Sequence, residues 1–179
     1  GTVLHQRRLG DTVIAYGDGG ISALVPHSSP VATFGIRDIQ GLGKGIGIAS
    51  RSAVGGSIDG HIFVDTSGAL WRVTTSLQAE RLGYEDYLAD LLDDEIVISH
   101  DPQRNEFYIA GTVDTTPICY VLTESGFGKA PWVPTNVCFT AGGLVSILMG
   151  TTAAGVEVIT NKFGARRRKD VDQITLVTL

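Results

Sequence analysis

Short β-type runs joined by tight turns recur along the chain. Residues 12–16 form one run, residues 17–20 hold the glycines that a tight turn needs, and residues 21–25 return with apolar side chains at alternate positions. The same pattern is repeated over residues 61–74, around a turn at Gly68. Because a hydrophobic period of two is typical of half-buried strands, both segments are predicted to be β-hairpins.

The clearest hairpin lies in the middle of the chain. Residues 95–99 and 106–110 flank a turn whose proline fixes φ and whose asparagine, Asn105, tolerates a left-handed backbone. Between residues 28 and 48 the signal weakens, because glycines interrupt any regular pattern. Later strands are expected at residues 118–123, 137–140, 144–149, 156–160 and 174–179.

One short helix is expected near residues 84–92. Its apolar residues are spaced at i, i+3, i+4 and i+7, which places Tyr84, Tyr87, Leu88 and Leu91 on one face. Two acidic residues fall in the first turn, where negative charge favours the helix dipole. The spacing predicts a helix that covers one end of a β-structure.

These elements predict an all-β, hairpin-repeat fold. Many short strands of this kind build a sandwich, a barrel or a propeller, and the successive hairpins favour blades of a β-propeller. Residues 1–179 are expected to form a single β-domain. Because a complete propeller needs more chain and the sequence does not open with Met, we expect a fragment of a longer propeller-containing protein.

Composition limits the chemistry further. Hydrophobic residues make up 43% and charged residues 18%, so the chain is expected to fold. The net charge of −5 argues against broad electrostatic binding of nucleic acid. The two cysteines, Cys119 and Cys138, lack the neighbours of a zinc site; two reduced apolar residues are favoured, and a disulfide stays open. No apolar run is long enough to cross a membrane.

Two polar segments could each be interpreted as a binding site, but each also has a simpler structural interpretation. The glycine-dense residues 41–47 lack the order of a phosphate-binding loop, so a connector is favoured. The acidic residues 93–95, with Asp90 nearby, match no calcium-loop spacing, so a solvated helix end is favoured over a metal site. Catalytic motifs of hydrolases and nucleotide-binding enzymes are absent. We therefore predict no enzyme activity, no catalytic residue, no metal and no cofactor.

The segment Asp65–Trp71 resembles the Asp-box turn of sialidase-type propellers. Its spacing departs from that motif by one residue, and such a turn supports the fold and does not catalyse. The alternative function is therefore a carbohydrate-binding, sialidase-like propeller without catalytic residues. Trp71, Trp132 or Tyr108 would then form the floor of a sugar pocket, whereas in the simpler interpretation they are core residues. A third possibility is a general propeller-type interaction scaffold.

The only strong run of charge is basic. It comprises Arg166, Arg167, Arg168 and Lys169, shortly before the last predicted strand. A solvated loop or strand start, paired with acids of the same or a neighbouring subunit, is the favoured interpretation. The functional alternative is a patch that faces DNA, which a ring of subunits would multiply into a cationic belt.

Several segments, taken in their order along the chain, resemble the β-propeller tail nozzle or tail-hub (packaged-DNA stabilisation) proteins of short-tailed bacteriophages. They are VIAYGDGGI (13–21), GHIFV (60–64), GALWRV (68–73), LGYEDYL (82–88), IVISHDP (96–102), EFYI (106–109), YVLTESG (120–126) and FGARRRK (163–169). Each segment alone is ordinary hairpin sequence, and their order carries the resemblance.

The resemblance implies a structural virion protein. It implies a homo-oligomeric ring, six subunits, below the portal and adaptor, which forms a conduit for packaged DNA and helps to retain it. The expected location is the virion tail, after assembly in the host cytoplasm. Partners would be other copies of the chain, the portal, the adaptor and other tail proteins, with non-specific contact to DNA and no membrane span. The basic residues 166–169 would face the channel or a neighbouring subunit.

Overall fold

A computed structural model describes the backbone of residues 1–28, 33–102, 104–130, 136–140, 143–152, 155–163 and 174–176, and side chains within the ranges up to residue 130. Within these ranges the chain forms four antiparallel sheets of four strands each. In every sheet the strands are hydrogen-bonded in the order in which they occur along the chain. The predicted all-β hairpin fold is thereby confirmed.

The first two sheets occupy residues 3–83. The first sheet contains β1 (Val3–Leu9), β2 (Thr12–Gly17), β3 (Ile21–Pro26) and β4 (Phe34–Asp38). The second sheet contains β5 (Val54–Gly56), β6 (Gly60–Val64), β7 (Leu70–Thr74) and β8 (Ala79–Gly83). The two earliest predicted hairpins correspond to β2–β3 and β6–β7.

The third sheet follows a short helical segment. The helix α1 (Glu85–Leu88) continues into a 3₁₀ turn, η1 (Ala89–Leu91), where the sequence predicted a helix. The third sheet contains β9 (Val97–Asp101), β10 (Glu106–Val113), β11 (Thr116–Thr123) and β12 (Gly126–Lys129). The fourth contains β13 (Asn136–Thr140), β14 (Gly143–Thr152), β15 (Gly155–Phe163) and β16 (Ile174–Leu176).

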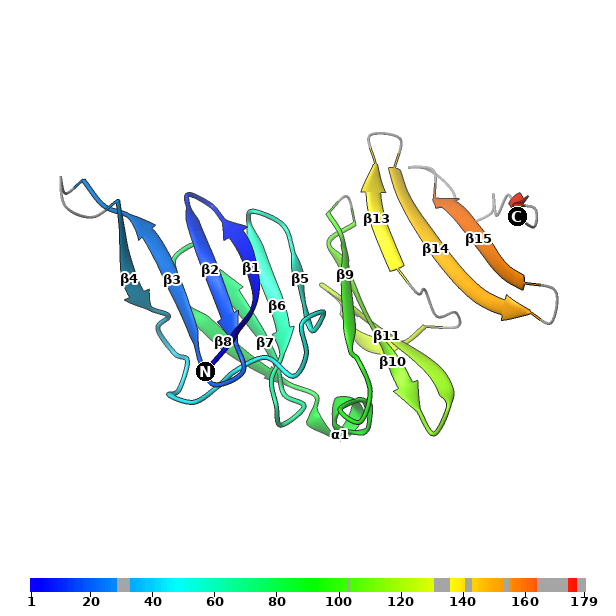
Figure 1. Cartoon of the computed structure of the whole chain (residues 1–179), viewed down its shortest axis with the longest axis horizontal. Coiled ribbons are helices and arrows are strands. Elements are labelled where there is room, and N and C mark those ends of the chain that lie inside the picture. The colour runs from blue at the N-terminus through cyan, green and yellow to red at the C-terminus, as the bar shows by residue number, and fades with distance from the viewer. Residues whose placement is uncertain are drawn as a thin grey trace.

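The sheets lie side by side in chain order, with the first and the fourth at opposite ends of the molecule (Figure 1). Their first strands lie next to one another: β9 contacts both β5 and β13. The strand β1 reaches β5 through a hydrogen bond from Arg7 Nη2 to the Gly56 carbonyl, 2.6 Å long. Four-stranded meanders with neighbouring first strands are arranged like successive blades of a propeller.

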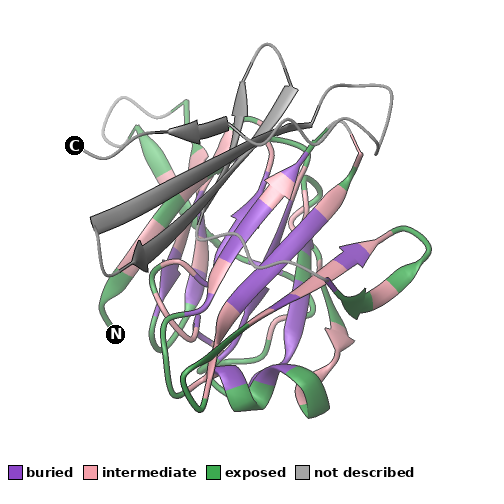
Figure 2. Cartoon of the chain, turned by 90° about the vertical axis from the view of Figure 1, so that its right-hand side faces the viewer, coloured by how far each residue is buried: buried purple, intermediate pink, exposed green. Residues whose placement is uncertain are grey.

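Two hydrophobic clusters hold the first three sheets together, and the second sheet contributes to both. Phe63 and Trp71 pack with Ile14 and Tyr16 of the first sheet. Ile62 and its neighbours on the opposite face pack with the third sheet and with the helical segment. Because side chains alternate along a strand, β6 is buried on both faces, which explains its continuous apolar sequence. Figure 2 shows this burial in the interior of the stacked sheets.

The glycine-rich residues 39–48 form the first part of the connection from β4 to β5. Ile39 and Ile48 anchor the two ends of this connector in the first cluster. Near its start, the Gln40 amide donates to the Leu77 carbonyl, and the Ala79 amide donates to the Gln40 carbonyl. At its end, the Ile48 amide donates to the Gly17 carbonyl. The segment is a connector that is anchored at its two ends and exposed in its middle.

The first sheet leaves one face uncovered by the described residues. Across its strands, Val13, Leu24 and Ile36 form one row on this face. Val13 and Leu24 are half-buried, whereas Ile36 is 75% exposed and Phe34 is 55% exposed. Apolar side chains at alternate positions on this face are typical of a sheet that packs against another layer.

Candidate functional site at the first strands of the sheets

A polar groove lies where the first strands of three sheets meet. It has a volume of about 400 Å³ and is lined from β1, β5 and β9 and from the turn after β5. Its polar side chains include His5, Arg7, Ser57, Ser99 and His100. This position is set by the fold, because each first strand turns one edge toward the first strands of its neighbours.

Arg7 is the only arginine among the described residues that line this groove, and it is half-buried. One of its five N–H donors is used on the Gly56 carbonyl, which ties β1 to β5. No carboxylate among the described residues forms an ion pair with the Arg7 guanidinium. Burial lowers the pKa of Arg7 from its ordinary value, but a guanidinium stays charged at neutral pH.

Two histidines flank Arg7 in the groove. Burial, together with the charges of Arg7 and Arg51, lowers the pKa of His5, although a hydrogen bond to the Arg51 backbone acts in the opposite direction. Burial also lowers the pKa of His100, against the influence of Asn105 and Asp101. Both rings are therefore neutral at pH 7.

The His100 ring is fixed in place and has a spare polar atom. It stacks on Phe107 with the ring centroids 4.2 Å apart. Its Nε2 atom is buried and has no hydrogen-bond partner among the residues that the structure describes. A buried imidazole nitrogen without a partner is costly, so a ligand atom that hydrogen-bonds it would be favoured.

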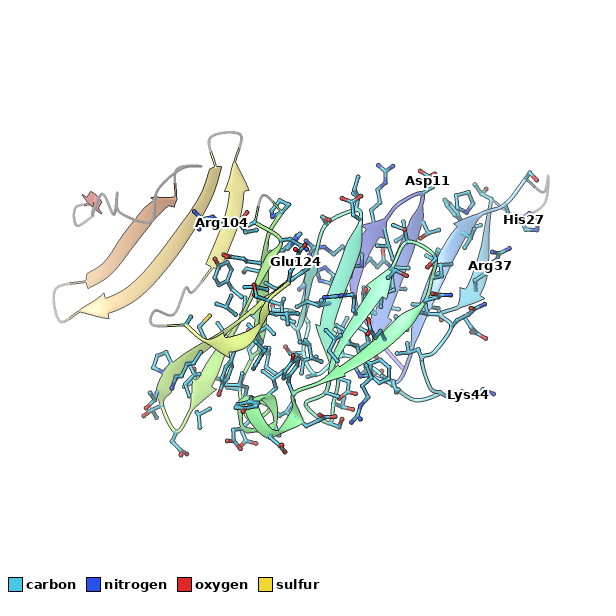
Figure 3. The ribbon with its side chains drawn as sticks, turned by 180° about the vertical axis from the view of Figure 1, so that it is seen from behind. Asp11, His27, Arg37, Lys44, Arg104 and Glu124 are labelled. Carbon is cyan, nitrogen blue, oxygen red and sulfur yellow. The ribbon has the colours of Figure 1, made fainter. Side chains whose placement is uncertain are left out.

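A second cleft adjoins the groove and shares Ser57 and His100 with it. It lies between the second and third sheets and has a volume of about 460 Å³. Its charges are mixed, with Asp59, Arg72 and Glu124 on its walls. Asn105 Nδ2 donates to Glu124 Oε1 over 3.1 Å. Figure 3 shows Glu124 and Arg104 at the same end of the third sheet.

His61 is completely buried but has a structural role. Its Nε2 atom lies 3.0 Å from the Arg8 carbonyl oxygen and its Nδ1 atom 2.9 Å from the Tyr16 hydroxyl. A carbonyl can only accept, so Nε2 carries the proton and Nδ1 accepts from Tyr16. Burial, with the nearby Arg7 charge, lowers the pKa of His61 to about 4. The neutral ring thereby links the first sheet to the second.

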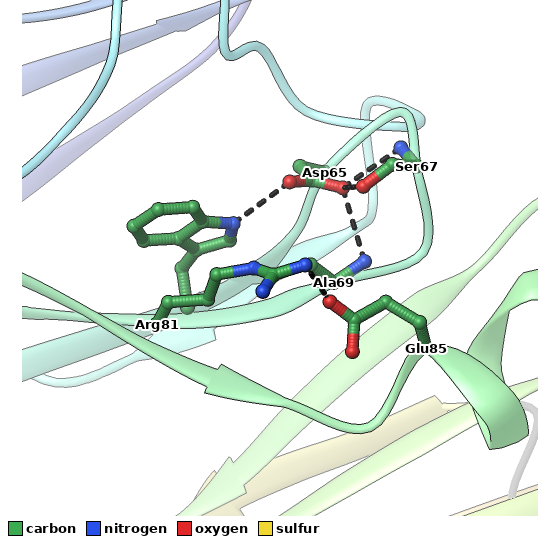
Figure 4. A network of polar contacts seen from close by, with 6 residues as sticks. Asp65, Ser67, Ala69, Arg81 and Glu85 are labelled. Carbon is green, nitrogen blue, oxygen red and sulfur yellow. Dashed lines mark hydrogen bonds and ion pairs between the residues drawn. The ribbon is translucent and has the colours of Figure 1, made fainter.

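Asp65 organises the turn that resembles an Asp-box. Its Oδ1 atom accepts from the Ser67 amide and hydroxyl and from the Ala69 amide, at 2.7, 2.6 and 3.0 Å. Its Oδ2 atom accepts from Trp71 Nε1 at 2.8 Å. Burial raises the pKa of Asp65, but these hydrogen bonds outweigh it and the net shift is downward. Figure 4 shows this network beside the Arg81–Glu85 ion pair.

The sequence had indicated a basic run and three aromatic residues as candidate functional groups. The basic residues Arg166, Arg167, Arg168 and Lys169, and also Trp132, lie outside the described residues. Trp71 and Tyr108 are buried in hydrophobic clusters, so neither forms the floor of an open pocket.

The remaining polar and sulfur-bearing candidates have simple environments. Cys119 is buried and free, and burial raises the pKa of its thiol to about 12; the side chain of Cys138 lies outside the described ones. Glu95 accepts a hydrogen bond from the Ser52 hydroxyl. The side chains that the structure describes contain no cluster of three metal-ligating residues. Among the described helices, none is long and apolar enough to cross a membrane.

Sequence reasoning did not find the groove. Its two histidines, His5 and His100, are 95 positions apart along the chain, and neither belongs to a sequence motif. In the structure, His5 and Arg7 lie on β1 and His100 on β9, the first strands of two different sheets. The groove is therefore recognisable only once these first strands are known to meet.

Comparison of the chain with models of known protein families, and with curated protein sequences, finds no match.

Proposed function

We propose that this chain is a structural, non-catalytic subunit of the tail of a short-tailed bacteriophage. Its sheets would be blades of a β-propeller, and six copies would form a ring that conducts packaged DNA and helps to retain it. In the virion the ring would contact the portal, the adaptor and other tail proteins. The observation that carries this proposal is the side-by-side placement of the first strands of successive four-stranded meanders.

The distribution of the motifs supports the proposal. Up to residue 126, the segments that resemble tail nozzle and hub proteins fall on the strands of successive sheets, among them β2–β3, β6–β7 and β9–β10. They also include the link from β8 into α1. The order of the hairpins in the sequence is therefore the order of the sheets in space.

The uncovered apolar face of the first sheet supports assembly. Another sheet placed on this face would remove Ile36 and Phe34 from water. Each square ångström of apolar surface that is buried contributes roughly 25 cal/mol. The contact would repeat the packing that already joins the first sheet to the second.

Native mass spectrometry and negative-stain imaging of the full-length protein test the proposal. A ring with a central opening is expected, either alone or on the portal–adaptor complex of the same virus. A protein that stays monomeric, ignores the portal–adaptor complex and binds glycans would overturn it in favour of a carbohydrate-binding propeller.

Charge reversal in the same experiment tests the basic run. Replacing Arg166, Arg167, Arg168 and Lys169 by Glu is expected to alter ring assembly or DNA retention while the circular dichroism spectrum is unchanged. The control replaces Arg37 and Lys44 by Glu, two exposed cations at the outer edge of the first sheet and in the connector (Figure 3). Normal assembly and normal DNA retention in the charge-reversed particles would contradict this assignment.

A further inference from the structure

The groove at the first strands contains a positive charge that the described residues do not neutralise. The Arg7 guanidinium is half-buried and donates to a carbonyl, not to a carboxylate. A partly buried cation without an anionic partner is unfavourable, because it has lost part of its hydration and no opposite charge compensates for that loss. An anion that entered the groove would remove this cost.

The nearby carboxylates do not serve as that anion. Glu95 accepts from the Ser52 hydroxyl at 2.6 Å, and Asp59 accepts from the Ser57 hydroxyl at 3.4 Å. Asp101, whose charge acts on His100, accepts from the Arg104 amide at 3.3 Å and has the Arg104 guanidinium 4.0 Å away. Each of them is engaged with a donor other than Arg7.

The remaining donors approach the groove from two sheets. Arg7 comes from β1 and His100 from β9, and the His100 Nε2 atom is buried and has no hydrogen-bond partner among the described residues. Ser57 also lines the groove, but its hydroxyl donates to Asp59 Oδ2. Donors that converge from different strands suit a tetrahedral anion better than a planar one. The fork of a guanidinium also matches two oxygens of a phosphate group.

We propose that this groove is an anion site that binds a phosphate group through Arg7, with His100 as an additional hydrogen-bonding partner. The phosphate is either the free ion or a phosphodiester of a nucleic-acid backbone, because both present the same oxygens. The site does not depend on the proposed tail function, since it needs only the meeting of β1, β5 and β9.

Isothermal titration of the full-length protein with inorganic phosphate, at low ionic strength, tests the site. The wild type is expected to bind, and Arg7→Gln is expected to weaken binding by roughly tenfold or more, as the loss of a charged hydrogen bond requires. His100→Gln, which can still hydrogen-bond, is expected to weaken binding less. Arg8→Gln is the matched control, because Arg8 follows in the same strand and its side chain is 68% exposed on the opposite face.

Arg7 also holds Gly56, so the melting temperature of each variant is measured first. If Arg7→Gln does not fold, Arg7→Lys replaces it: the charge stays, the fork is lost, and binding is expected to fall several-fold. Absence of phosphate binding in the wild type would overturn the proposal, as would equal binding by the Arg7 and Arg8 variants. Acetate that bound as tightly as phosphate would overturn the assignment of the anion class.

A short single-stranded oligonucleotide identifies the source of the phosphate. Binding that is lost in Arg7→Gln and retained in Arg8→Gln would assign the site to a nucleic-acid backbone. Binding of inorganic phosphate alone would assign it to the free ion. Failure of the tail proposal appears separately, as the absence of rings in the images, and leaves these titrations unaffected.

Discussion

At the scale of single residues, the buried side chains of Asp65 and His61 fix the position of the second sheet. Both make their hydrogen bonds to groups of the protein itself. Asp65 satisfies two backbone amides, a hydroxyl and an indole N–H. His61 satisfies a carbonyl and a hydroxyl of the first sheet. Such groups are favourable only while each partner is present, so they fix one geometry of the turn and of the contact between sheets.

The neutral state of His61 makes stability depend on pH. Its pKa is about 4 in the folded protein, against 6.5 in an unfolded chain. Between these values the unfolded chain binds more protons, so the free energy of unfolding falls as the pH is lowered from 6.5 to 4, by up to about 3 kcal/mol. His5 and His100, whose pKa values are also lowered, add to the slope in the same direction.

Urea unfolding at a series of pH values measures this slope. His61→Gln, whose amide can replace both hydrogen bonds but does not titrate, is expected to show a clearly smaller loss of stability over the same range. His27→Gln is the control, because His27 is exposed at the edge of the first sheet (Figure 3). Equal slopes for the wild type and His61→Gln would contradict the assignment.

At the scale of elements, the connector of residues 39–48 shows that a glycine can be needed for space as well as for its backbone angle. Gly41 and Gly45 have nearly the same positive φ, +81° and +84°. A Cβ on Gly41 would overlap the carbonyl oxygen of Ala79, whereas a Cβ on Gly45 would meet open space. The pair therefore separates the cost of the angle from the cost of the contact.

Alanine substitutions measure the two costs. Gly45→Ala is expected to lower the free energy of unfolding by about 1 kcal/mol, for the left-handed backbone alone. Gly41→Ala is expected to cost about 1–3 kcal/mol more, because the connector must move away from the Ala79 backbone. Chemical denaturation of both variants provides the comparison. Equal losses in the free energy of unfolding would show that the connector moves away from the Ala79 backbone without a loss of stability.

Hairpins with strong alternation were predictable from sequence, and short or glycine-containing strands were not. The central hairpin was found because β10 combines aromatic and branched residues around a well-defined turn. The strand β4 was missed because Gly35 interrupts its pattern and both its apolar residues are exposed. The strand β5 has only three residues, two of them glycine, and owes its conformation to pairing with β6.

The candidate site was beyond sequence reasoning for a related reason. Arg7 and His100 meet because the first strands of separate sheets converge, and no local pattern encodes that convergence. The basic residues 166–169 are adjacent in the sequence and are therefore visible as a charge run. The groove residues Arg7 and His100 are adjacent only in space.

At the scale of the whole molecule, the second sheet couples the first to the third. Its strand β6 is buried on both faces, since Phe63 belongs to one hydrophobic cluster and Ile62 to the other. Loss of the first sheet would uncover one side of the second, and the packing of the third sheet would weaken in turn. The three sheets are therefore expected to unfold as one cooperative unit.

Ile14→Ala tests this coupling. Ile14 is fully buried in the first cluster, and its truncation is expected to cost about 2–5 kcal/mol. In hydrogen exchange followed by mass spectrometry, peptides from β10 in the third sheet are expected to lose protection together with peptides from β2. Ile36→Ala is the matched control, because the same change in the same sheet removes a side chain that is 75% exposed. If protection fell in the first sheet alone, each sheet would be stable by itself, and the shared second sheet would be a contact surface without a role in cooperativity.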